Sequence, residues 1–221
     1  LDFCFKNDLI DTTSLKLTII GELINDTRLE PSEALTLLYA FNVSNVAFKS
    51  VLKIICICAS LSKSITDFFN INEEDHNLIK QLSKISNDSE HILLLNLYNH
   101  IHAERDNVKH NLKLYETVKK LYNKQKDKML NMFKKHNIKL NITPDDDLNI
   151  NIINSLNYGY KSNIAKKNGN MFKYNNLACN ISKSVYKFEQ YNAIIFYENL
   201  FLNNKLNIMI CSPYLPSGLV I

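Results

Sequence analysis

Lysine and aromatic residues alternate along the last third of this 221-residue chain. Ammonium groups can contact phosphates, and aromatic rings can stack on bases, which is how small barrels bind single-stranded nucleic acid. The candidate lysines are Lys161, Lys166, Lys167, Lys173, Lys183 and Lys205, and the rings between them are Tyr158, Tyr160, Phe172 and Tyr174. An alternative carries equal weight, in which the rings fill a core and the lysines keep the surface soluble.

Catalytic chemistry is harder to find in the sequence. None of the four glycines begins a G-x-x-x-x-G-K-[ST] loop, and no D-E-x-H acidic box is present to hold magnesium. The two arginines, Arg28 and Arg105, stand in no finger motif, and serine, cysteine and histidine form no nucleophile and base arrangement. We therefore name no catalytic residue and expect that this segment does not hydrolyse ATP alone.

The cysteines indicate a reducing compartment and free thiols, because five of them occur without a signal peptide. Cys56 and Cys58 are two apart in an apolar run, so on a helix they face different directions, and a core position is favoured over a metal site. The histidines have no metal-ligand spacing, and we expect no metal. The apolar run 54–59 is far shorter than the roughly 20 residues that span a bilayer. We expect a soluble protein with no membrane partner that is not secreted.

Elements that would position these residues follow from hydrophobic spacing. Between residues 31 and 135, apolar residues recur three and four apart, which predicts a helical bundle. Pro31 suits the first turn of a helix, and Ser89 is a candidate N-cap with Glu90 in the first turn. Lysines on the long helix after residue 112 could follow phosphates, but a solvated face is favoured; they are Lys113, Lys120, Lys124 and Lys128.

The sequence changes character after residue 137. Thr143 and the acidic residues 145–147 predict a helix start rather than a cation site. Short strands are expected at 171–174, 177–181, 185–188, 193–202 and 206–211. Short strands with one helix beside them suit a small barrel of the OB type. The predicted fold class is mainly α with a small β-barrel.

Four short motifs resemble the C-terminal region of DEAH-box RNA helicases, in the same order and at similar separations. The family patterns L-x-D, L-T-x-x-G, L-x-P and A-x-L-S match segments that begin at Leu9, Leu17, Leu29 and Ala59. The structural motif residues that this resemblance marks are Leu17, Thr18, Gly21, Leu29, Pro31, His91 and Gly159. Residues 150–165 also resemble a helix of the family with the pattern I-x-x-x-x-x-G-x-x-x-N-x-A, so the resemblance implies a helix there. Near the C-terminus the likeness is weaker, since the family's I-H-P-S-S reads Ile181, Ser182, Lys183, Ser184 and Val185 here.

The resemblance divides the chain into three parts. Residues 1–30 would end a winged-helix domain, 31–135 would form a helical ratchet-like bundle, and 136–221 would form an OB-fold-like barrel. His91 could contact RNA or another domain, although a partly buried polar residue near a helix start is the favoured interpretation. The chain begins at Leu1 inside the expected winged helix, so we expect it to be a fragment.

The resemblance also implies a function. The chain would be the accessory module of an ATP-dependent helicase that grips single-stranded RNA, most often in pre-mRNA splicing or ribosome assembly in the nucleus. No cofactor would bind this segment, while ATP and Mg would bind the motor domains of the parent protein. Expected partners are RNA, the motor domains and an activator protein docked on the winged helix or barrel. The alternative is a binding or scaffold protein without a motor.

Overall fold

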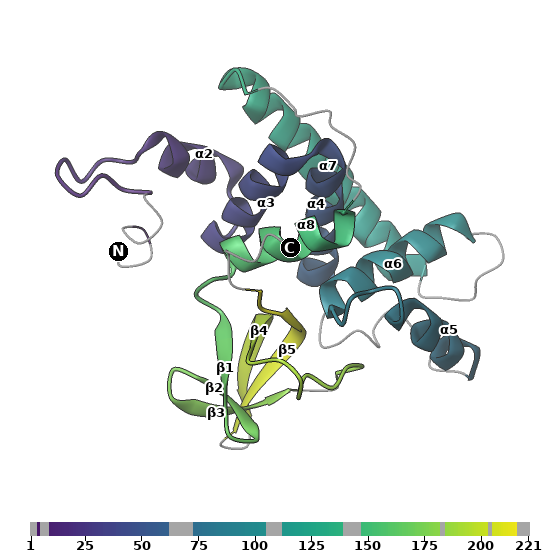
Figure 1. The fold of residues 1–221 in the computed structure, drawn as a ribbon. Helices are drawn as coiled ribbons and strands as arrows, with labels where there is room; N and C mark the ends of the chain where they lie inside the picture. Colours follow the sequence, from purple (N-terminus) through teal and green to yellow (C-terminus); the bar gives the residue numbers. More distant parts are fainter. Residues whose placement is uncertain are drawn as a thin grey trace.

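A computed structural model describes residues 4, 9–61, 73–104, 112–138, 147–181, 184–202 and 205–215. Helices form one part of the molecule, and a small barrel lies against them (Figure 1). The helices are α2 (Ile19–Thr27), α3 (Pro31–Val43), α4 (Asn45–Ser60), α5 (Glu73–Ser83), α6 (Glu90–Ala103), α7 (Leu112–Lys135) and α8 (Leu148–Gly159). The predicted class, mainly α with a small β-barrel, is confirmed.

Several helix starts follow from side chains that bind free backbone N–H groups. Pro31 is the first residue of α3, where its missing N–H has no intrahelical partner to lose. Ser44 Oγ accepts from the Ala47 N–H at 2.9 Å, and Ser89 Oγ accepts from the Ile92 N–H at 3.2 Å. The predicted N-cap at Ser89 is confirmed, which fixes where α6 begins.

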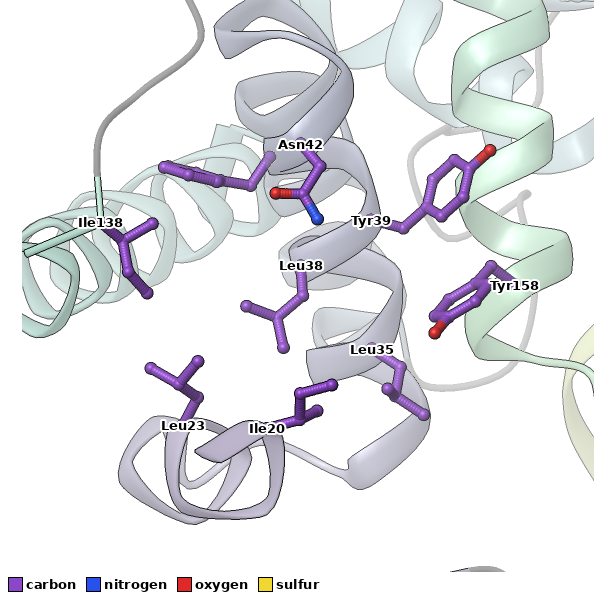
Figure 2. A pocket seen from close by; sticks show the side chains of 9 residues that line it. Ile20, Leu23, Leu35, Leu38, Tyr39, Asn42, Ile138 and Tyr158 are labelled. Carbon is purple, nitrogen blue, oxygen red and sulfur yellow. The ribbon is translucent and has the colours of Figure 1, made fainter. Parts of the chain in front are cut away.

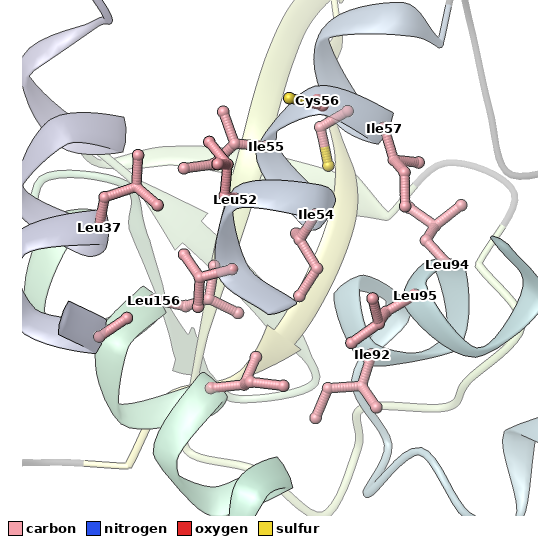
Figure 3. Close-up of a cluster of buried hydrophobic side chains, with 14 of the residues drawn as sticks. Leu37, Leu52, Ile54, Ile55, Cys56, Ile57, Ile92, Leu94, Leu95 and Leu156 are labelled. Atoms are coloured by element: carbon pink, nitrogen blue, oxygen red, sulfur yellow. The ribbon is translucent and has the colours of Figure 1, made fainter. Parts of the chain in front are cut away.

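Helix α4 runs through the centre of the helical part, and its side chains meet those of α3, α6 and α8 (Figure 3). Leu52, Ile54 and Ile57 are almost fully buried there. Cys56 and Cys58 are buried in the same cluster, as expected for core residues. Burial raises the pKa of Cys56 to about 12, so its thiol stays protonated near neutral pH.

Helix α8 packs closely against α3 because Gly159 has no side chain. A Cβ at this position would overlap Thr36 Oγ1 and the Ser32 carbonyl oxygen. The sequence analysis placed this helix in the barrel segment, but its buried residues, Ile152, Ile153 and Leu156, belong to the helical cluster. Helix α8 thus joins the bundle, and the chain enters the barrel directly after it (Figure 1).

Five strands close into a barrel in the order β1-β2-β3-β5-β4. They are β1 (Ile164–Asn168), β2 (Met171–Tyr174), β3 (Leu177–Ile181), β4 (Ala193–Leu202) and β5 (Lys205–Pro213). The β3–β5 pair is parallel, and the other pairs are antiparallel. Asn175 and Asn176 have φ of 48° and 66°, as a tight hairpin between β2 and β3 requires. Phe172, Phe188 and Phe196 fill the barrel core.

Two sequence expectations in this region are wrong. The helix expected over 150–165 ends at Gly159, and residues 164–168 form β1 instead. The strand expected over 185–188 is an irregular segment whose Phe188 side chain points into the barrel core. Residues 143–146 of the predicted helix start lie outside the described residues, and α8 begins at Leu148.

Candidate functional site

Lys166 and Lys173 lie directly opposite each other on the neighbouring strands β1 and β2. Lys166 follows Ala165, which is buried in the barrel, so the alternation of a strand turns Lys166 outward. The residues beside this pair in the same row are Ala193 on β4 and Ala178 on β3. The lysine pair therefore stands on the outer face of the barrel between two small side chains.

The lysine pair has no acidic partner among the described residues. Within the residues that the structure describes, neither Lys166 nor Lys173 forms an ion pair. Like charges directly opposite on adjacent strands repel and destabilise the sheet. A bound anion would offset this repulsion. The arrangement can bind phosphate groups, and it contains no group for bond-breaking chemistry.

The structure separates the other predicted lysines from this pair. Lys167 lies opposite Phe172, and its Nζ donates to the Glu189 carbonyl oxygen. Lys205 is exposed at the start of β5, opposite Leu202. Lys161 lies in the turn after α8, with Nζ 5.5 Å from the centre of the Tyr158 ring. Lys183 lies outside the described residues.

The four aromatic residues were expected either to stack on bases or to fill a core, and the structure shows how far each one is buried. Phe172 is buried in the barrel core, and Tyr160 is buried against the helical cluster. Tyr174 is half-buried, with its ring edge against Phe196. Tyr158 is 43% exposed and stacks on Tyr39, with 5.1 Å between the ring centres. Of the four, Tyr158 is the most exposed, and its ring already contacts Tyr39 and the Lys161 ammonium group.

Tyr39 and Tyr158 also line an apolar pocket of about 240 Å³ between α2, α3 and α8 (Figure 2). Most of its walls are aliphatic, and Ile20, Leu23, Leu35 and Leu38 face into it. Asn42 provides an amide at one side. The pocket contains no acid, base or nucleophile with which to perform a reaction.

A buried polar contact joins α6 to the barrel, and we call it the seam. It consists of Ser89, Glu90 and His91 from the first turn of α6 and of Ser184, Val185, Cys211 and Ser212 from the barrel. Glu90 accepts three hydrogen bonds, from the Cys211 N–H at 2.7 Å, the Ser184 hydroxyl at 2.7 Å and the Val185 N–H at 3.1 Å. Figure 1 shows α6 beside the barrel at this point.

The electrostatics of the seam are those of a buried carboxyl group. Burial raises the pKa of Glu90, and the three hydrogen bonds oppose that rise. The place of Glu90 in a first helical turn is predictable from the sequence, whereas its bonds to the barrel are not. Their partners are 94 to 121 residues away along the chain, so no local pattern reveals them.

His91 is buried beside Glu90, in agreement with the favoured interpretation of a buried polar residue near a helix start. Its Nδ1 lies 2.7 Å from Ser212 Oγ, which in turn lies 2.6 Å from Ser89 Oγ. Its Nε2 has no partner among the described residues. Burial lowers the pKa of His91 to about 3, so the ring is neutral near pH 7. Its contact with Ser212 joins α6 to the barrel.

The remaining motif residues hold the backbone in place. Thr18 caps α2 by accepting from the Gly21 N–H at 3.1 Å, and a Cβ on Gly21 would overlap the Leu9 carbonyl oxygen. Leu17 pairs with Ile10 in an isolated β-bridge, and Leu29 packs against the core clusters. With Pro31 and Gly159 described above, all seven motif residues have structural contacts.

The four lysines that the sequence places along α7, which we call the lysine ladder, have different surroundings in the structure. They are Lys113, Lys120, Lys124 and Lys128. Lys120 and Lys124 are exposed, whereas the Lys128 Nζ donates to the Thr27 carbonyl oxygen on α2. Lys113 is in the first turn of α7. One lysine of the ladder therefore joins two helices, and the ladder is not a continuous cationic face.

Within the described ranges, no group of three or more His, Cys, Asp or Glu side chains could hold a metal ion. No described helix is both long and apolar enough to cross a membrane. A scan against protein-family models finds no family that matches this chain. A search of curated proteins finds no similar sequence.

Proposed function

We propose that this chain is an RNA-gripping accessory module of an ATP-dependent DEAH-box RNA helicase. The observation that carries the proposal is the lysine pair of Lys166 and Lys173 on the outer face of a closed five-stranded barrel, where neither lysine forms an ion pair with a described residue. The strand order of this barrel, with a parallel β3–β5 pair, suits an OB-type fold. Barrels of this kind bind single strands through cationic grooves and exposed rings.

The rest of the proposal rests on the sequence motifs. Helix α2 with the preceding bridge between Ile10 and Leu17 would end a winged helix, and α3 to α7 would form the ratchet-like bundle. The parent protein would hydrolyse ATP with Mg in motor domains that are separate from this segment. Its site of action would be nuclear, with pre-mRNA splicing first, and an activator protein would dock on the winged helix or barrel.

The test of the RNA contact is fluorescence anisotropy with a labelled 12-nucleotide oligouridine at several salt concentrations. Each phosphate contact on a single strand contributes about 0.7 to the slope of log affinity against log salt. The variant Lys166→Ala/Lys173→Ala should therefore lower the slope by about 1.4. A matched control, Lys80→Ala/Lys84→Ala, removes two exposed charges from the end of α5 and its following turn and should bind like the wild type.

If the slope of log affinity against log salt is the same for the two double variants, the proposed RNA contact on the barrel is wrong. The assignment to a helicase has its own test, the intact mass and coding sequence of the native gene product. A product that contains a G-x-x-x-x-G-K-[ST] loop and a D-E-x-H box supports the helicase proposal. A product without them, which still binds RNA through the lysine pair, is a binding protein without a motor.

A further inference from the structure

The hairpin that carries the lysine pair ends in an exposed Asn168–Gly169 step, the only Asn-Gly sequence in the chain. Strand β1 ends at Asn168, which pairs with Met171, so Gly169 and Asn170 form a two-residue turn. Gly169 has φ of +61°, as the first position of such a turn requires. The Asn168 side chain is exposed, so its amide is open to water.

Two features of this turn favour an attack of the Gly169 nitrogen on the Asn168 side chain. The Gly169 N–H stands outside the β1–β2 ladder and forms no backbone hydrogen bond with another described residue. Glycine also has no Cβ beside the carbonyl carbon of the preceding side chain, and a Cβ there would have no neighbour within 4 Å. Nothing that the structure describes therefore obstructs the bending of the turn.

The reaction needs only water as a second reactant. The Gly169 nitrogen bonds to Asn168 Cγ, the proton of the Gly169 N–H leaves with the side-chain amide group as ammonia, and a cyclic succinimide forms. Water then opens the ring at either of its carbonyl groups. The product is aspartate at position 168, or isoaspartate where the chain continues through the side chain. In both products a carboxylate replaces a neutral amide.

The position of Asn168 decides which groups this carboxylate would meet. Alternation along β1 places Asn168 on the same outer face as Lys166, and Lys173 is its diagonal neighbour on β2. No Asp or Glu occurs between Asp147 and Glu189, so β1, β2 and β3 carry no acid. The reaction would give the lysine pair a carboxylate that these strands otherwise lack. The lysine charges also favour the transient backbone anion through which the reaction passes.

We propose that Asn168 deamidates spontaneously, that the lysine pair speeds this reaction, and that the carboxylate formed neutralises the lysine pair. The reaction itself does not depend on the proposed function, whereas its effect on RNA binding rests on it. The site acts as a slow chemical timer. A newly made chain binds a strand through the lysine pair, and an aged chain binds it less tightly.

The first test follows the reaction by mass spectrometry in the intact folded protein, which is kept in neutral buffer and sampled over several weeks. Trypsin yields the peptide 168–173, and the next peptide contains Asn175 and Asn176. Both are exposed residues of the tight β2–β3 turn and neither precedes glycine, so they are internal controls. Asn168 should deamidate at least about tenfold faster than either, a barrier difference of about 1.4 kcal/mol. Equal rates would overturn the proposal.

Two variants test the causes of the fast reaction. Gly169→Ala places a methyl group beside the reacting carbonyl and should lower the rate to that of the control asparagines. Lys166→Ala/Lys173→Ala should slow the reaction about threefold at low salt and not at high salt, where the lysine charges are screened. The matched control Lys80→Ala/Lys84→Ala should react like the wild type. If both double variants react equally fast at low salt, the lysine pair does not speed the reaction and that part of the proposal is wrong.

The effect on binding is measured with two variants at the same position. Asn168→Asp has the carboxylate from the start, and Asn168→Ser has neither a carboxylate nor an amide. In the oligouridine anisotropy assay, Asn168→Asp should lower the salt slope by about 0.7, because one lysine charge is neutralised. Asn168→Ser should bind like the wild type, and aged wild-type protein should approach Asn168→Asp. Equal binding by the two variants would contradict the neutralisation of the lysine pair.

The outcomes separate this inference from the proposed function. If Lys166→Ala/Lys173→Ala binds RNA like its control, the barrel contact is wrong and the loss of binding on deamidation fails with it. The reaction rates still decide in that case whether Asn168 is a modification site. If the double variant loses affinity while Asn168 reacts no faster than Asn175, the barrel contact stands and the deamidation site is wrong.

Discussion

The seam and the lysine pair handle charge in opposite ways. At the seam, one buried carboxyl group accepts three hydrogen bonds, and every barrel partner comes from the same chain. On β1 and β2, two lysines face each other with no described acidic partner. A polar group whose bonds are completed within the fold maintains structure, whereas charges left uncompensated at a surface point to a ligand. Glu90 belongs to the first class, and Lys166 and Lys173 to the second.

The largest effect should come from removing the seam carboxyl group. Glu90→Ala leaves the Cys211 N–H, the Val185 N–H and the Ser184 hydroxyl without their acceptor. We expect a loss of about 3–5 kcal/mol in the free energy of unfolding, as measured by urea denaturation. The control Glu198→Ala removes an exposed carboxylate and should change stability by less than about 0.5 kcal/mol. Equal stabilities of the two variants would mean that the seam is not structural.

The next largest effect concerns the close packing of α8 on α3. Gly159→Ala pushes a methyl group into Thr36 and Ser32 on α3, so α8 must move, and we expect a loss of roughly 3 kcal/mol. Gly169 has φ of +61° and open space around it, so Gly169→Ala should cost only about 1 kcal/mol. The thermal unfolding midpoints of the two variants compare the cost of a steric clash, in Gly159→Ala, with the cost of backbone strain, in Gly169→Ala. A Gly159→Ala protein as stable as Gly169→Ala would contradict the close packing of α3 and α8.

The pH dependence of stability sharpens the contrast further. The pKa of His91 is about 3 in the folded protein and near 6.5 when unfolded, so protons bind the unfolded chain more tightly. The contribution of His91 to the free energy of unfolding is constant above pH 6.5. As the pH falls below that value, the contribution decreases by about 1.4 kcal/mol per pH unit. Glu90, whose pKa is raised, acts with the opposite sign above its ordinary pKa, so a variant is needed to isolate His91.

The isolating variant is His91→Gln, compared with the wild type by urea denaturation at pH 7.5 and pH 5. The wild-type protein should lose about 2 kcal/mol more than the variant between these values. A histidine NMR titration gives an independent check, since the His91 ring should stay neutral to below pH 4. A midpoint near pH 6.5 would show that His91 is not buried in solution.

The smallest effect on stability, with the opposite sign, should come from the lysine pair. Lys166→Glu replaces a repelling cross-strand pair by an attractive one with Lys173, and we expect a gain of about 0.2–1 kcal/mol. The same change should weaken oligouridine binding more than Lys166→Ala does. A seam residue could not give this combination of higher stability and weaker binding. If both properties fall together, the lysine pair is structural and the contrast with the seam is lost.

Much of the fold was predictable because its signals are local. Ser89 and Pro31 mark helix starts through their own chemistry, and β2, β3 and β4 have the boundaries expected from alternation and turn residues. The segment 185–188 also alternates, yet the Val185 N–H bonds to the side chain of Glu90 rather than to a strand. Its partner is distant in the chain, so alternation alone predicted a strand wrongly.

The candidate site was only partly predictable, for a related reason. The sequence singles out lysines, but cross-strand register decides that Lys166 meets Lys173 while Lys167 turns to the Glu189 carbonyl. Strand β1 itself was missed, because two lysines and an asparagine are weak strand formers and pairing with β2 and β4 overrides that preference.

The buried cysteines give the molecule its own reporters of opening. Burial raises the pKa of Cys56, Cys58 and Cys211, so all three thiols are protonated and shielded while their surroundings stay closed. Alkylation then requires local unfolding, and its rate measures how often that happens. Cys211 lies at the seam and the other two in α4, so peptide-resolved labelling would show whether the barrel detaches before the bundle opens.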